Sequence, residues 1–302
     1  MKVISVPASL DEHSFDPMLE GLVDDSGRRV LLDARHLRFA DPFGMLGLLA
    51  VGEYVKRSGE LAILQLPDEA DVVGYMARMD FFEQGRDLFE MHGAARRRRG
   101  DETTSSDVLL EITAVNSHQD VHAVVDRVNR RAMDILTHQL NYPKIQAGQF
   151  SVILSEVCQN IIEHAESGGW VATQTYTYKK RLGGRKVVII AVMDLGIGFR
   201  ASLTSAHATR FADRWNDATA LESAFMHGLS RFHDPGRGQG LQQIRRNVNR
   251  WGGRFSIRSG TARIADVPEW DEGSPMDQNL AYFPGAQICI ILPARLDHET
   301  VG

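Results

Sequence analysis

The sequence has only two cysteines and no long apolar run. Its longest hydrophobic stretch, residues 187–193, is far shorter than the ~20 residues of a membrane-spanning helix. The first residues lack the apolar core of a signal peptide. Cys158 and Cys289 lie in apolar stretches without the spacing of metal ligands, which predicts buried thiols in a reducing compartment. From these absences we expect a cytoplasmic protein that does not contact a membrane.

An excess of basic residues is also missing. The chain has 34 Lys and Arg against 39 Asp and Glu, a net charge of −5. A general nucleic-acid binder has a basic footprint, so we do not expect nucleic acid as a partner. With 302 residues, of which 43% are hydrophobic, the chain is long enough for two domains with separate cores.

The composition changes abruptly at residues 92–107, where four consecutive arginines precede polar and acidic residues. So little apolar surface predicts a solvated linker between a domain at 1–91 and a domain at 108–302. An alternative is that the arginines contact nucleic acid or an acidic partner, but a run of four is a weak signal.

The N-terminal domain alternates short apolar stretches with helical patterns. This alternation predicts a small α/β layer domain. The expected strands are residues 2–6, 28–37 and 61–66, and the expected helices are residues 44–59 and 70–83.

The C-terminal domain is expected to be α+β, with a mixed sheet and helices on one face. Residues 170–180 and 186–194 are predicted to pair as strands around the glycines at 183–184. The other expected strands are 108–115, 254–259 and 286–294, and the expected helices are 121–140, the segment around 155–165, and 240–253.

The helix around "SEVCQNIIEHA" carries polar residues at a fixed spacing. Glu156, Asn160 and Glu163 fall on one stripe, beside an apolar stripe that can pack on a sheet. Asparagine is a poor residue for a helix interior, but its amide oxygen suits Mg²⁺. A glutamate one turn away could accept a proton from a nearby water or hydroxyl. The alternative is a solvated face of an amphipathic helix.

The stretch "VMDLGIGF" ends an apolar strand with an acid and two glycines. Asp194 could accept a hydrogen bond from an amine, and Gly196 and Gly198 would let the backbone approach a flat ligand closely. A tight turn without a ligand also uses glycines, so this pattern alone is only moderately specific.

The stretch "DPGRGQGLQQI" alternates glycines before a helix. Backbone N–H groups at Gly236, Gly238 and Gly240 suit a phosphate, and Arg237 adds a positive charge. This pattern is weak alone, but the three motifs together suit the metal, the base and the phosphates of one nucleotide.

The motifs "EVCQN", "DLGIG" and "GRGQGL" resemble those of the GHKL superfamily, which includes gyrase, histidine kinases and MutL. The resemblance covers about residues 108–293, and "RWGGRFSIRSG" matches the segment that usually follows the third motif. It implies a Bergerat fold that binds ATP and Mg²⁺. By position, it implies a general base at Glu156, a metal ligand at Asn160 and adenine recognition by Asp194. Further ATP-binding positions that it implies are Gly196, Gly198, Gly236, Arg237, Gly238, Gln239, Gly240 and Leu241.

One departure from that family concerns the adenine site. The family commonly has Gly-Thr before the last strand, and this chain has Gly285-Ala286. Because an alanine side chain cannot donate a hydrogen bond, we expect fewer adenine contacts and a modest affinity.

Residues 1–90 resemble, more loosely, the STAS domains of anti-sigma-factor antagonists. The stretches "FADPFGMLGLLAVGEYVKRSGE" and "LQLPDEADVVGYMARMDFFE" resemble their phosphoacceptor helix and closing segment. After Asp41 the chain reads Pro42-Phe43-Gly44, so the serine of those domains is absent. This implies a docking module rather than a phospho-switch. The alternative is an unrelated small α/β domain.

These resemblances imply a regulatory protein that acts through a protein partner or substrate. It would hydrolyse ATP or transfer the γ-phosphate to a protein serine or threonine. Two alternatives remain: a switch ATPase whose dimer responds to closure of residues 199–235, and an ATP sensor without catalysis. A histidine kinase is not expected, because no histidine lies in a recognisable phosphoacceptor motif.

Overall fold

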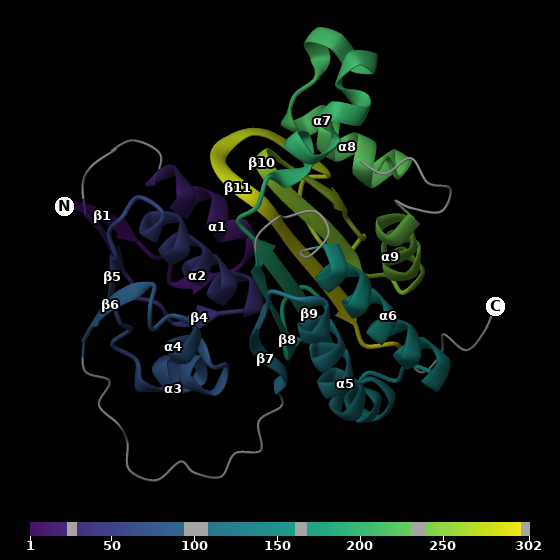
Figure 1. Cartoon of the computed structure of the whole chain (residues 1–302). Helices are drawn as coiled ribbons and strands as arrows, with labels where there is room; N and C mark the ends of the chain where they lie inside the picture. Colours follow the sequence, from purple (N-terminus) through teal and green to yellow (C-terminus); the bar gives the residue numbers. More distant parts are fainter. Residues whose placement is uncertain (23–28, 94–107, 161–167, 231–238, 297–302) are drawn as a thin grey trace.

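The computed structural model describes residues 1–22, 29–93, 108–160, 168–230 and 239–296. The two larger sheets of the described chain lie side by side, one in each half of the sequence (Figure 1). Of the expected linker, His92 ends a strand, and residues 94–107 lie outside the described residues. No helix in the described ranges is both long and apolar enough to cross a bilayer.

The N-terminal half contains a parallel sheet of four strands in the order β1-β3-β5-β6, which confirms the expected α/β class. A short parallel pair, β2-β4, lies beside it. Helix α1 was not expected from the sequence. The strands are β1 (Lys2–Ser5), β2 (Ser9–Leu10), β3 (Val30–Asp33), β4 (Phe39–Ala40), β5 (Ala62–Gln65) and β6 (Phe89–His92), and the helices are α1 (Glu12–Glu20), α2 (Pro42–Lys56), α3 (Ala70–Arg78) and α4 (Phe81–Gln84).

The helix expected over 70–83 is broken into α3 and α4. Asp80 has a left-handed backbone conformation with φ 64°, which ends one helix and lets the next begin at Phe81.

The C-terminal half contains five strands in the order β10-β11-β9-β8-β7. Every described pairing in this sheet is antiparallel, so the expected mixed sheet is wrong. The reason is local: hairpins join β8 to β9 and β10 to β11. The strands are β7 (Val108–Val115), β8 (Gly169–Tyr178), β9 (Arg185–Asp194), β10 (Arg254–Asp266) and β11 (Met276–Pro293), and the helices are α5 (His118–Asp134), a π-helical turn (Ile135–Gln139), α6 (Lys144–Asn160), α7 (Gly198–Phe211), a 3-10 turn (Ala212–Arg214), α8 (Asp217–His227) and α9 (Gln239–Arg250).

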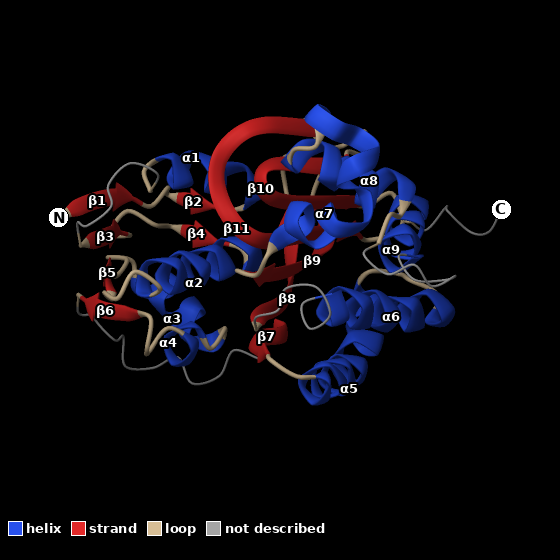
Figure 2. Ribbon diagram, turned by 45° about the horizontal axis from the view of Figure 1, so that its top comes forward, coloured by secondary structure: helices blue, strands red, loops and turns tan. Residues whose placement is uncertain are grey.

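Strand β9 is buried on both faces, because two different sets of helices cover this sheet. Val188, Ile190 and Val192 belong to the core formed with α5, α6 and α9. Ile189 and Ala191 alternate with them and belong to the core formed with the N-terminal half. Figure 2 shows α2 between the two sheets. The expected helices on one face are present, and the N-terminal half covers the other face.

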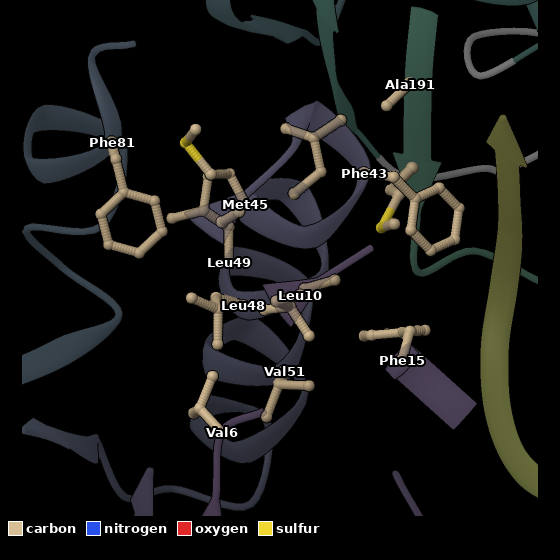
Figure 3. Close-up of a cluster of buried hydrophobic side chains, with 14 of the residues drawn as sticks. Val6, Leu10, Phe15, Phe43, Met45, Leu48, Leu49, Val51, Phe81 and Ala191 are labelled. Atoms are coloured by element: carbon tan, nitrogen blue, oxygen red, sulfur yellow. The ribbon is translucent and has the colours of Figure 1, made fainter. Parts of the chain in front are cut away.

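The start of α2 forms part of this shared core. Asp41 caps the helix by accepting a hydrogen bond from Gly44 N at 2.8 Å. Phe43 is only 1% exposed and meets the ring of Phe15 edge-on, with 5.6 Å between centroids. Figure 3 shows Phe43 beside Ala191 of β9. The first residues of α2, Pro42 to Gly44, are therefore enclosed between the two halves.

Buried ion pairs join α1 to β10 across the same interface. Arg254 pairs with Glu12, and Arg258 Nε lies 2.6 Å from Asp16 Oδ1. Arg263 Nη1 approaches the other oxygen of Asp16 at 3.1 Å. Both Arg254 and Arg258 are at most 2% exposed. A buried charge is tolerated only when it is paired, so these contacts fix how the halves dock.

Neutralising Asp41 should remove a pH dependence of stability. Burial raises the pKa of this carboxyl from 3.8 to about 8, although the hydrogen bond from Gly44 opposes the rise. Because the folded pKa exceeds the unfolded one, ionisation costs stability as the pH rises from about 4 to about 8. Asp41→Asn keeps a capping oxygen but does not ionise. Between pH 5 and pH 8, the free energy of unfolding of Asp41→Asn should rise by about 2–4 kcal/mol relative to that of wild type.

The measurement is urea unfolding of both proteins at pH 5, 6.5 and 8. Wild type should lose stability along this series relative to Asp41→Asn. Parallel profiles for the two proteins would mean that Asp41 ionises freely in the folded state.

Candidate functional site

The described parts of the three predicted motifs lie on the central strand of the C-terminal sheet and on two neighbouring helices that cover it. Helix α6 ends at Asn160, strand β9 ends at Asp194, and α9 begins at Gln239. Gly169, where the chain re-enters the sheet after α6, pairs directly with Asp194. Helices α6 and α9 lie next to each other on the same face of the sheet (Figure 1). Residues far apart in sequence thus surround one strand end.

Asp194 is a buried acid with one oxygen held by the backbone. Its Oδ1 accepts hydrogen bonds from Gly196 N at 2.8 Å and from Ala286 N at 3.2 Å. Among the described residues, Oδ2 has no hydrogen-bond partner. Burial raises the pKa of this carboxyl to about 6, although both N–H groups and the positive charge of Arg57 oppose the rise. Asp194 is therefore mostly ionised at neutral pH and can accept a further hydrogen bond.

The glycines around Asp194 are needed for close approach. Gly198 has φ 71°, and a Cβ there would lie 2.9 Å from Ser259 Oγ. Gly285 has φ 78°, and a Cβ there would collide with the carbonyl oxygen of Asp194. A side chain at either position would disturb the turn that holds the acid.

Ala286 supports Asp194 through its backbone. Its side chain cannot hydrogen-bond, but its backbone N–H donates to Asp194. A hydroxyl is also present nearby: Ser259 Oγ donates to Gly285 O at 2.7 Å and accepts from Phe199 N at 3.1 Å. The sequence motifs did not identify Ser259, because its role depends on the pairing of β10 with β11.

Glu156 lies against the first turn of α9. A Cβ added at Gly240 would collide with Glu156 Oε2, so the glycine lets this carboxylate come close to the helix backbone. The N-terminus of a helix stabilises an anion through its free N–H groups and its dipole. The predicted base therefore neighbours Gly240, the one glycine of the third motif that lies within the described residues.

Asn160 carries a buried polar atom without a hydrogen-bond partner. Its Nδ2 is enclosed, yet no donor or acceptor in the described part of the chain satisfies it. Because amide oxygen and nitrogen are interchangeable in assignment, this points to an unmet hydrogen bond or ligand bond at the end of α6. The described residues contain no cluster of three His, Cys, Asp or Glu that could hold a metal alone.

Several of the predicted site residues cannot be placed in the structure. Glu163, Gly236, Arg237 and Gly238 lie outside the described residues. Gln239 and Gly240 open α9, and Leu241 packs against the core beneath that helix.

The stretch expected to be a lid, residues 199–235, is helical in its described part. It holds α7, a 3-10 turn and α8, which project together beyond the end of the sheet (Figure 1). Asn216 caps α8 by accepting a hydrogen bond from Thr219 N at 2.9 Å. The pair α7 and α8 therefore forms ordered structure beside the candidate site.

Comparison of the chain with known proteins gives no assignment: no family model matches it, and no curated protein is significantly similar to it.

Proposed function

We propose that this chain binds ATP with Mg²⁺ at a GHKL-type site and acts as a regulatory protein. It would hydrolyse ATP or transfer the γ-phosphate to a serine or threonine of a protein partner. The observation that carries the proposal is Asp194, a buried carboxylate with one oxygen fixed by two N–H groups and the other without a hydrogen-bond partner among the described residues. Such an oxygen suits an exocyclic amine.

The residues present fit the nucleotide and its metal. Oδ2 of Asp194 would accept from the adenine amine, and the glycine turn would let the base lie close to the backbone. The unsatisfied amide of Asn160 would supply one oxygen to Mg²⁺, which keeps several waters and phosphate oxygens as its other ligands. When bound, Mg²⁺ neutralises phosphate charge. Glu156 would accept a proton from the attacking water or hydroxyl.

The substrate or partner would be another protein. In the N-terminal half, Phe43 belongs to the stretch Pro42-Phe43-Gly44, where the resemblance places the serine of a STAS domain, and this side chain is enclosed. That arrangement supports a permanently docked module over a self-phosphorylated one. A non-catalytic sensor is the second candidate, because Glu156 rests against α9 in this structure.

The test combines calorimetry with ATP turnover in the presence of Mg²⁺. Wild type should bind ADP and consume ATP. Glu156→Gln should bind ADP normally and lose about 100-fold or more of the turnover. Asn160→Ala should lose Mg²⁺-dependent binding. Glu222→Gln, which neutralises an exposed acid of α8, is the matched control.

The outcomes separate the candidates. Turnover lost in Glu156→Gln alone would establish an enzyme, and labelling of added proteins would then distinguish a kinase from a hydrolase. Binding without turnover would establish a sensor. If wild type binds neither ADP nor ATP, the proposal is wrong.

A further inference from the structure

An arginine of the N-terminal half reaches the turn that follows Asp194. Arg57 caps the C-terminal end of α2, and its Nη1 donates to the carbonyl oxygen of Leu195 at 2.6 Å. Its Nε lies 3.4 Å from Glu53 Oε1, one helical turn earlier. Leu195 itself is buried, with 2% exposure. The guanidinium thus donates to one acceptor in each half of the chain.

The peptide group between Leu195 and Gly196 is fixed on both sides. Its N–H donates to Asp194 Oδ1 at 2.8 Å, and its C=O accepts from Arg57. A peptide unit is planar, so fixing the direction of the C=O also fixes the direction of the N–H. A charged donor makes the stronger kind of hydrogen bond. Without Arg57, this peptide could rotate and Asp194 would lose one of its two supports.

We propose that Arg57 is a positioning residue of the nucleotide site, through which the N-terminal half sets the nucleotide affinity of the C-terminal half. This inference rests on the proposed function. Arg57 does not itself contact the ligand in this account. It orients the Leu195–Gly196 peptide, and that peptide orients Asp194.

The charge of Arg57 supports this assignment. It lowers the pKa of Asp194 against the effect of burial. Within the described residues, the groups that donate hydrogen bonds to Asp194 are uncharged: the N–H groups of Gly196 and Ala286, and Gln287 Nε2, which lies 3.4 Å from its carbonyl oxygen. Removing the arginine should therefore raise the pH below which Asp194 becomes protonated and ceases to accept a hydrogen bond from an amine.

The experiment measures ADP affinity between pH 5 and pH 8 for wild type, Arg57→Met, Arg57→Lys and Lys56→Met. Arg57→Met should bind about tenfold more weakly at pH 7.5, since it loses one charged hydrogen bond. Its affinity should also begin to fall at a higher pH than in wild type. Arg57→Lys keeps the charge. Its pH profile should therefore resemble that of wild type more closely than its affinity does. Lys56→Met removes an exposed neighbouring charge of the same helix and should behave as wild type.

Hydrogen exchange of the nucleotide-free proteins gives a second readout, over the peptide at residues 194–199. Exchange there should be faster in Arg57→Met, while the midpoint of urea unfolding stays unchanged. Unaltered affinity, pH profile and exchange in Arg57→Met would refute the inference and leave the proposed function intact. If wild type binds no nucleotide, the proposed function fails, and exchange still decides whether Arg57 holds this peptide.

Discussion

Replacing Arg258 by methionine should lower the free energy of unfolding by about 3–5 kcal/mol, as expected when one partner of a buried ion pair is removed. The guanidinium is 2% exposed and lies 2.6 Å from Asp16. It also donates to the carbonyl oxygens of Gly260 and Ala281. Methionine fills similar space but leaves these acceptors without a donor in a region that water does not reach.

Urea unfolding measures this loss, with an exposed ion pair as the control. Arg38→Met removes the partner of Glu69, where the side chains are 71% and 54% exposed, and should cost less than about 1 kcal/mol. Adding Asp16→Leu to Arg258→Met should recover part of the loss, because it removes a buried acid that keeps only Arg263 as its ion-pair partner. Equal costs for Arg258→Met and Arg38→Met would mean that the buried pair does not fix the docking of the two halves.

Replacing Phe43 by serine should cost about 3–5 kcal/mol, since a ring is removed from the core that the two halves share. Phe43 is 1% exposed and meets Phe15 edge-on. The introduced hydroxyl would also be buried, which adds to the cost unless it finds a hydrogen-bond partner. The midpoint of urea unfolding should therefore fall well below that of wild type.

The matched control is Phe39→Ser, because Phe39 is 38% exposed and contacts the ring of Tyr176. Its cost should be clearly smaller. Mass spectrometry after incubation with Mg-ATP should find no phosphate at position 43 in Phe43→Ser. A variant that is as stable as wild type and becomes phosphorylated there would instead indicate a mobile phosphoacceptor helix.

The sequence predicted the strands and helices whose patterns are local. The apolar run of β9 indicated a buried strand, and it is buried on both faces. In β10, Arg254 and Arg258 alternate with Phe255 and Ile257, which is typical of a strand with one face in solvent. Both arginines are instead buried, because acids of α1 neutralise them. Periodicity shows that a face is polar, but not what covers it.

The candidate site was predictable where its residues are adjacent in sequence. The motif placed Asp194 at the end of an apolar strand, where it lies, and the hydrogen bond that it accepts from Gly196 N was not predicted. The approach of Glu156 to Gly240 joins two motifs that the sequence only placed in order. Arg57 carries no such signal: it contacts Leu195 from a sequence distance of 138 residues, and only the docking of α2 brings the two together.

The ion pairs between α1 and β10 also constrain the order of events during synthesis. Glu12 precedes Arg254 by 242 residues, and Asp16 precedes Arg258 by the same number. At the usual rate of translation, about 10–50 s separate the two sides of each pair. For that interval the N-terminal half has left the ribosome with its acids unpaired and its docking face uncovered. A ribosome that stalls before β10 would therefore hold a chain whose apolar docking face stays exposed, as in the folding intermediates that need chaperones.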